Sequence, residues 1–190
     1  MIALHFPKLS GYVRTGEICT IATPHAQGAL KCAQDACVFD SSGPVPSQSR
    51  ATALWPDGSV KWLLTHFMAD LPANKGTDAY YLDKGVPAAP AQPARAALHD
   101  GAARIDTGAL CLTLGGPGQP VFESARFAGG AFDAQELTGP AVTVDGQDYQ
   151  AFVGPEGWQI VEAGPVRTIV QTSGKHTGAG GEKLDFDLLI

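Results

Sequence analysis

Residues 55–62 read Trp-Pro-Asp-Gly-Ser-Val-Lys-Trp, a turn sequence with a tryptophan at each end in a chain that has only three tryptophans. Proline presets φ for the second position of a turn, aspartate tolerates the third, and glycine supplies a positive φ that would strain a residue with a side chain. Residues 51–54 and 63–67, on either side, can form strands. The stretch therefore predicts a β-hairpin.

Two registers of this hairpin are possible, and they pair Trp55 differently. A two-residue loop would pair Trp55 with Val60 and put both indoles on one face. A type I turn followed by a bulge at Gly58 would pair Trp55 with Ser59. Pro56 favours the bulged register, because proline suits the second turn position and cannot donate a ladder hydrogen bond.

The bulged register predicts different surroundings for the two tryptophans. Trp62 should point into the protein, and Trp55 should lie on the opposite face beside Lys61. The stem of Lys61 can then lie over the Trp55 indole, leaving an aromatic surface with a cation next to it. Trp55 and Lys61 are therefore candidate substrate-binding residues for a sugar ring that carries a carboxylate. The alternative is that the pair only seals the end of a barrel.

The rest of the chain has almost no helical periodicity. Apolar residues alternate or come in short runs, and turn residues interrupt them about every eight to twelve positions, which is typical of an all-β protein. In the first half the pattern predicts strands at residues 17–22, 36–40, 48–55, 59–71 and 78–83. In the second half it predicts strands at residues 104–107, 109–114, 121–127, 141–144, 149–153, 158–162, 165–173 and 184–190. The pair Asp145-Gly146 predicts a further hairpin turn.

A change of composition separates these two halves. Residues 86–97 read VPAAPAQPARAA, with three prolines and six alanines, which is too proline-rich for a helix and too small-chained for a core. The pattern predicts an extended linker. We expect a first domain at residues 1–86, a linker at 87–101 and a second β domain at 102–190.

The last residues, 184–190, alternate and then end apolar, with no turn residue or polar tail. Domain ends usually fray in polar residues. This predicts that the chain is part of a longer protein and that the second domain is truncated. Asp185 and Asp187 share one face of this strand, where they either flank an acid/base site or form a solvated surface.

The totals exclude several function classes. A net charge of −6 and scattered basic residues argue against a nucleic-acid surface. The sequence contains no run of about 18 apolar residues, which a membrane-spanning helix would need. The N-terminus lacks a secretory signal pattern, which predicts a cytoplasmic protein. Four cysteines without zinc or redox spacing predict reduced thiols, with a disulfide between Cys32 and Cys37 as the alternative.

Several segments together resemble one known family. The segments are residues 45–50 (Val-Pro-Ser-Gln-Ser-Arg), the hairpin and its flanks at 53–64, residues 162–167 (Glu-Ala-Gly-Pro-Val-Arg) and 174–176 (Gly-Lys-His). In this order they are similar to the N-terminal part of exo-rhamnogalacturonan lyases and YetA-like proteins. The resemblance implies a small RIFT-type β-barrel, then the start of an antiparallel β-sandwich, then a helical toroid that is absent from this sequence.

The resemblance also implies a reaction, β-elimination at a uronic acid linked to rhamnose. A base removes the C5 proton, a cation neutralises the carboxylate, and the bond at C4 breaks without water. The implied partners are an acidic oligosaccharide or polysaccharide and the protein's own C-terminal toroid, with no nucleic acid and no membrane. No cofactor is evident in this sequence, and a divalent metal in the missing part is possible. We expect residues 1–190 alone to be inactive.

His176 is the candidate catalytic base among five histidines. It follows Gly174 at a predicted strand end and precedes the glycine-rich residues 177–181, a place where a side chain can meet substrate. The alternative is an exposed loop histidine without a role.

A second function hypothesis is a non-catalytic β module that binds glycan or supports a partner domain, and the acidic charge motivates it.

Overall fold

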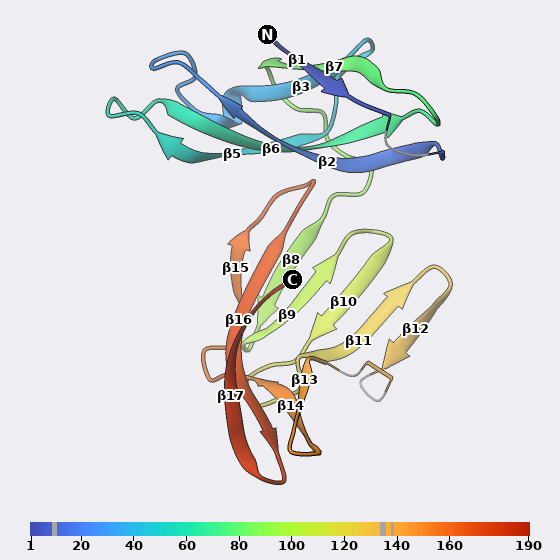
Figure 1. Cartoon of the computed structure of the whole chain (residues 1–190), viewed down its shortest axis with the longest axis vertical. Coiled ribbons are helices and arrows are strands. Elements are labelled where there is room, and N and C mark those ends of the chain that lie inside the picture. Colours follow the sequence, from blue (N-terminus) through green and yellow to red (C-terminus); the bar gives the residue numbers. More distant parts are fainter. Residues whose placement is uncertain (9–10, 134–135, 138) are drawn as a thin grey trace. The chain divides into compact units, whose positions relative to one another are not determined.

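The computed structural model describes residues 1–8, 11–133, 136–137 and 139–190. Its regular elements are antiparallel β-strands and one short 3₁₀ turn, η1 (Ala33–Asp35), which confirms the predicted all-β class. The chain divides into two compact units, Met1–Ala91 and Gln92–Ile190. Figure 1 shows the strands of each unit. Among the described residues, no helix is long and apolar enough to cross a membrane.

The first unit is built from two sheets. Its strands are β1 (Ile2–Phe6), β2 (Arg14–Pro24), β3 (Ala36–Asp40), β4 (Gly43–Pro44), β5 (Ser47–Leu54), β6 (Val60–Leu71) and β7 (Thr77–Lys84). One sheet has the order β1-β7-β3-β4 and the other the order β2-β6-β5. All five strands predicted in this half are confirmed within a few residues, and β1 and β4 are the two strands that the sequence pattern did not predict.

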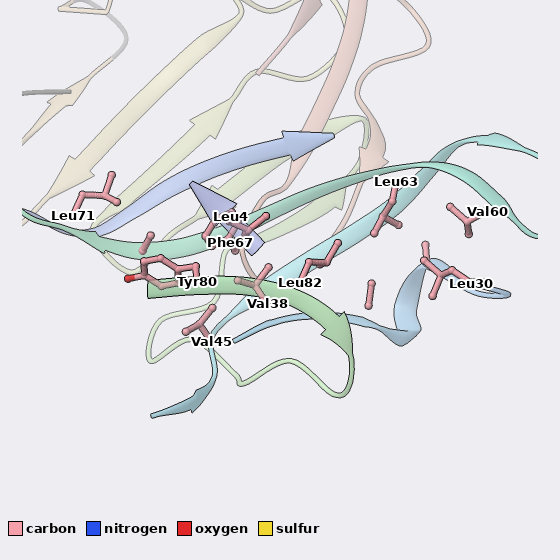
Figure 2. Packing of buried hydrophobic residues seen from close by; sticks show 13 residues of the cluster. Leu4, Leu30, Val38, Val45, Val60, Leu63, Phe67, Leu71, Tyr80 and Leu82 are labelled. Atoms are coloured by element: carbon pink, nitrogen blue, oxygen red, sulfur yellow. The ribbon is translucent and has the colours of Figure 1, made fainter. Parts of the chain in front are cut away.

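The two sheets of the first unit share one hydrophobic core, shown in Figure 2. Alternate residues of β6 supply its centre, because successive side chains of a strand point to opposite faces. Phe67 is fully buried, and its ring lies 6.0 Å from the ring of Phe6 and 5.9 Å from that of Tyr80. Leu30, from the loop after β2, joins the same core. The packing of Leu30 in the core therefore fixes the position of the loop after β2.

The predicted burial of Trp62 is wrong, because the alternation of β6 changes beside the turn. Leu54 pairs with Val60 and Ala53 pairs with Trp62, so Lys61 has no partner on β5 and forms a bulge. The extra residue reverses the faces to which the side chains on its two sides point. Val60 and Leu63 are therefore both buried, and Trp62 is 42 % exposed.

The second unit contains the remaining strands. They are β8 (Arg95–His99), β9 (Ala102–Asp106), β10 (Leu110–Leu114), β11 (Phe122–Phe127), β12 (Gly130–Asp133), β13 (Ala141–Val144), β14 (Gln147–Val153), β15 (Gln159–Glu162), β16 (Ile169–Gly178) and β17 (Gly181–Leu189). One sheet has the order β12-β11-β10-β9-β8, and in the other β16 pairs with β14, β15 and β17. A single core joins residues of both sheets, including Ile105, Leu114, Val153 and Val170, so the unit is a β-sandwich.

Two segments of this unit differ from the sequence prediction. Residues 95–99, expected to be linker, form β8 and pair with β9 across a two-residue turn. Asp100 and Gly101 both have positive φ, 50° and 77°, which makes this the favoured type of hairpin turn. Residues 177–181, expected to be a flexible loop, are instead the end of β16, a short turn and the start of β17. The Asp145-Gly146 hairpin between β13 and β14 is confirmed.

Candidate functional site

The hairpin between β5 and β6 has the predicted bulged turn. The backbone N–H of Gly58 donates to the Trp55 carbonyl at 2.9 Å, and the N–H of Trp55 donates to the Ser59 carbonyl at 2.8 Å. Gly58 has a φ of 79°, as a bulge glycine requires. The pairing of Trp55 with Ser59 is therefore confirmed.

Lys61 lies over the Trp55 indole, as the register predicts. Its Nζ is 4.6 Å from the ring centroid, within the range of a cation–π contact. The indole Nε1–H donates to the His25 carbonyl at 2.9 Å, and the side chain is half-buried. Because that donor is used and one ring face meets the ammonium, Trp55 mainly fixes the position of Lys61. The accessible polar group of the pair is the ammonium.

Polar contacts tie the hairpin to the loop that follows β2. The Asp57 carboxylate accepts hydrogen bonds from the Ser59 hydroxyl at 2.6 Å and from the Ser59 N–H at 3.0 Å. The Ser59 hydroxyl accepts from the N–H of Gly28 at 2.8 Å. These hydrogen bonds to the charged form lower the pKa of Asp57, the Ser59 hydroxyl contributing most. Desolvation lowers the pKa of His25, and the positive N-terminus adds to this effect. The hairpin tip is thus held in place by hydrogen bonds to the loop after β2.

Replacing Gly58 with alanine should destabilise the first unit by about 1–2 kcal/mol, because a side chain in this left-handed conformation is strained. Space is not the cause, since an added Cβ would meet no atom within 4 Å. Gly58→Asn should cost less, since asparagine tolerates this conformation better. Urea unfolding measures both. Equal losses for the two variants would contradict the assignment of strain.

His176 lies at a different kind of position from the one predicted. It belongs to β16 and is 6 % exposed, so the expectation of an exposed loop histidine is wrong. Its ring packs edge-on against Phe186 at 5.3 Å, and its Nδ1 is 3.3 Å from the Leu184 carbonyl oxygen. The alternation of β16 explains the burial, because His176 points toward the core side, as Val170 and Thr172 do. Its role as a base stays a prediction.

Asp185 and Asp187 share one face of β17, as the alternation predicts. Asp185 lies opposite Lys175 and Asp187 opposite Ser173 on β16. These four residues line a groove together with Phe152 of β14. Phe152 and Lys175 were not among the predicted site residues. The period-2 pattern of residues 149–153 and 171–177 was the available signal, since it places both side chains outward.

The cysteines and the possible metal ligands are the remaining groups with reactive or coordinating side chains. Cys19, Cys32, Cys37 and Cys111 are free thiols. Burial raises the pKa of Cys37, and also that of Cys19, where nearby Glu17 adds to the effect. Within the described parts of the chain, no group of three or more His, Cys, Asp or Glu side chains is placed to hold a metal ion.

Comparison with known proteins gives one finding for the first unit. Residues 9–84 match the family model described as the PcRGLX-like N-terminal RIFT barrel domain. The match contains the whole hairpin of residues 55–62 and six of the seven strands of the first unit. No curated protein matches the chain. The first unit is therefore a RIFT-type barrel, and the residues that the structure describes form an all-β protein.

Proposed function

We propose that this chain is the front, glycan-contacting part of a rhamnogalacturonan lyase-like enzyme, and that Lys61 and Trp55 contact a uronate of the substrate. The observation that carries the proposal is the family match over residues 9–84, which includes the hairpin that presents these two side chains. The matched model describes an N-terminal domain, so the proposal assigns β-elimination to another part of a longer protein.

The chemistry of the Lys61–Trp55 pair supports this role. A uronate has a carboxylate that an ammonium attracts and an apolar C–H face that an aromatic ring can meet. The indole keeps Lys61 extended beside the turn, and the Trp55 hydrogen bond to His25 fixes the indole. Because the chain carries a net charge of −6, a local ammonium is needed to offset repulsion of an acidic glycan.

The proposal assigns no catalytic base to the two units of this chain. His176, the residue predicted for that role, is buried against Phe186, and a base must reach the proton that it removes. The first unit and the sandwich would then bind and position glycan. A purely supporting role for the two units is the competing hypothesis, and the variants below separate the two.

Lys61→Gln should weaken binding of a rhamnogalacturonan oligosaccharide by up to about fivefold, the value of one exposed ion pair. Affinity electrophoresis of the 190-residue chain in gels containing the polysaccharide measures this change. The charge-preserving Lys61→Arg should retain binding and its decrease with added salt. Trp55→Ala should also weaken retention, because it frees the Lys61 stem.

Trp62→Ala is the matched control, since Trp62 is an exposed tryptophan of the same hairpin and is not the ring that meets the Lys61 ammonium. It should leave retention unchanged. If Lys61→Gln and Trp55→Ala migrate as the unaltered chain does, the two units only support a partner domain. If Trp62→Ala has the larger effect, the glycan contacts Trp62 rather than the Lys61–Trp55 pair, and the assignment of Lys61 is wrong.

A further inference from the structure

The second unit carries a groove of about 1020 Å³ that is independent of the hairpin site. It lies over three neighbouring strands, β14, β16 and β17. Phe152 lies opposite Lys175, and Lys175 lies opposite Asp185, while Ser173 lies opposite Asp187 in the next row. Residues opposite each other in an antiparallel sheet point to the same face. The groove therefore presents an aromatic ring, an ammonium, a hydroxyl and two carboxylates side by side.

Most of the apolar surface of this groove comes from β14 and two loops, although Phe186 of β17 also lines it. The ring of Phe152 belongs to β14, and Pro117 and Pro155 from two loops add further apolar surface. The carboxylates belong to the other side, on β17. A flat apolar surface with polar groups along one side fits a ligand that has an apolar face and a rim of hydroxyl groups.

The charged groups of the groove are ordered but only partly used. The Nζ of Lys175 donates to Oε2 of Glu182 at 2.7 Å, which leaves further N–H donors on the same ammonium. That hydrogen bond, with attraction from Glu182 and then Asp185, raises the pKa of Lys175. Among the described residues, no hydrogen bond reaches the carboxylate of Asp185 or Asp187. Both carboxylates can accept hydrogen bonds from a ligand.

The balance of charge selects the class of ligand. The groove contains one lysine against three carboxylates, Glu182, Asp185 and Asp187. A polyuronate would meet repulsion there, whereas hydroxyl groups of a neutral sugar can donate to the carboxylates and accept from Lys175. Ligand sites usually have volumes of about 300–1,000 Å³. The groove lies just above this range, which suits an oligosaccharide better than a single sugar.

We propose that the groove formed by Phe152, Lys175, Asp185 and Asp187 binds a neutral oligosaccharide. The pyranose C–H face packs on Phe152, ring hydroxyls donate to Asp185 and Asp187, and Lys175 donates to a ring or hydroxyl oxygen. This site lies on the sandwich and does not depend on the function proposed for the hairpin. It would let the protein hold uncharged branches or neighbouring chains of a polysaccharide while acidic sugars meet Lys61.

The test is an NMR titration of the isotopically labelled 190-residue chain with four probes of equal length: mannotetraose, cellotetraose, β-1,4-galactotetraose and tetragalacturonate. At least one neutral probe should bind with a Kd below about 1 mM and shift amide signals of β14, β16 and β17. Tetragalacturonate should bind this groove at least about tenfold more weakly. Phe152→Ala should reduce the affinity for the neutral probe by about five- to tenfold.

Two controls keep the outcome interpretable. Phe127→Ala removes an exposed phenylalanine from β11, in the other sheet, and should leave the affinity unchanged. The double variant Asp185→Asn and Asp187→Asn should bind tetragalacturonate more tightly than the unaltered chain does, an effect that loss of folding would not produce. The proposal is overturned if no neutral probe shifts these strands, if tetragalacturonate binds the groove as tightly, or if Phe152→Ala and Phe127→Ala behave alike.

Discussion

Phe67→Ala should lower the free energy of unfolding of the barrel by about 3–5 kcal/mol. Phe67 is fully buried on β6, and its ring meets Phe6 and Tyr80, which come from β1 and β7. Alanine would leave a cavity between the two sheets, because a closely packed interior relaxes only in part. A loss of this size is a large fraction of the stability of a small domain.

Phe39→Ala is the matched control for this prediction. Phe39 lies in the same unit and stacks on Tyr81 at 5.3 Å, but it does not belong to the buried core. Its removal should cost only about 0.5–1.5 kcal/mol, the value of an aromatic pair. Urea unfolding, followed by the amide signals of each unit separately, measures both variants. Similar losses for Phe67 and Phe39 would contradict the position of the core.

Trp158→Ala should destabilise the sandwich by about 3–5 kcal/mol. Trp158 is 2 % exposed in the core of the second unit, and its Nε1–H donates to the Gly115 carbonyl at 2.9 Å. Alanine would remove both the packed ring and the partner of a buried carbonyl. The change should appear in the amide signals of β9, β14 and β16 at a lower urea concentration, with the barrel signals unchanged.

Trp158→Phe separates the two contributions. Phenylalanine keeps much of the apolar volume but leaves the Gly115 carbonyl without its donor, which should cost about 1–3 kcal/mol. If Trp158→Phe is as harmful as Trp158→Ala, the hydrogen bond carries the effect. If neither variant changes the unfolding of the sandwich, Trp158 is not part of its core.

The strands of the barrel could be predicted because local signals and burial agree there. Turn residues mark the ends of β3, β5, β6 and β7, and the Pro-Asp-Gly sequence specified the bulged hairpin before any contact was known. The exposure of Trp62 could not be predicted in the same way. It depends on a bulge at Lys61, within the strand, and no residue type marks that position.

The linker prediction failed for a different reason. The proline-rich composition ends at residue 93, and the strand at residues 95–99 is followed by Asp100-Gly101, a hairpin signal as clear as Asp145-Gly146. Small side chains can form an exposed strand, since pairing with β9 satisfies the backbone. The Asp100-Gly101 dipeptide by itself predicts this hairpin.

The candidate sites were predictable only in part. The stacking of Lys61 on Trp55 followed from the turn register, and the shared face of Asp185 and Asp187 followed from alternation. The groove did not follow, because it joins residues of β14, β16 and β17 that only long-range pairing brings together. The burial of His176 depends in the same way on the hairpin that β16 forms with β17.

The most direct test of the function proposed for the barrel is to map where an acidic glycan contacts the labelled chain. A tetrasaccharide of alternating galacturonate and rhamnose should shift the amide signals of residues 55–62, with a shift that weakens at high salt and is largely lost in Lys61→Gln. The chain should release no unsaturated uronate from it. Unchanged signals at residues 55–62 in the presence of the tetrasaccharide would contradict the account.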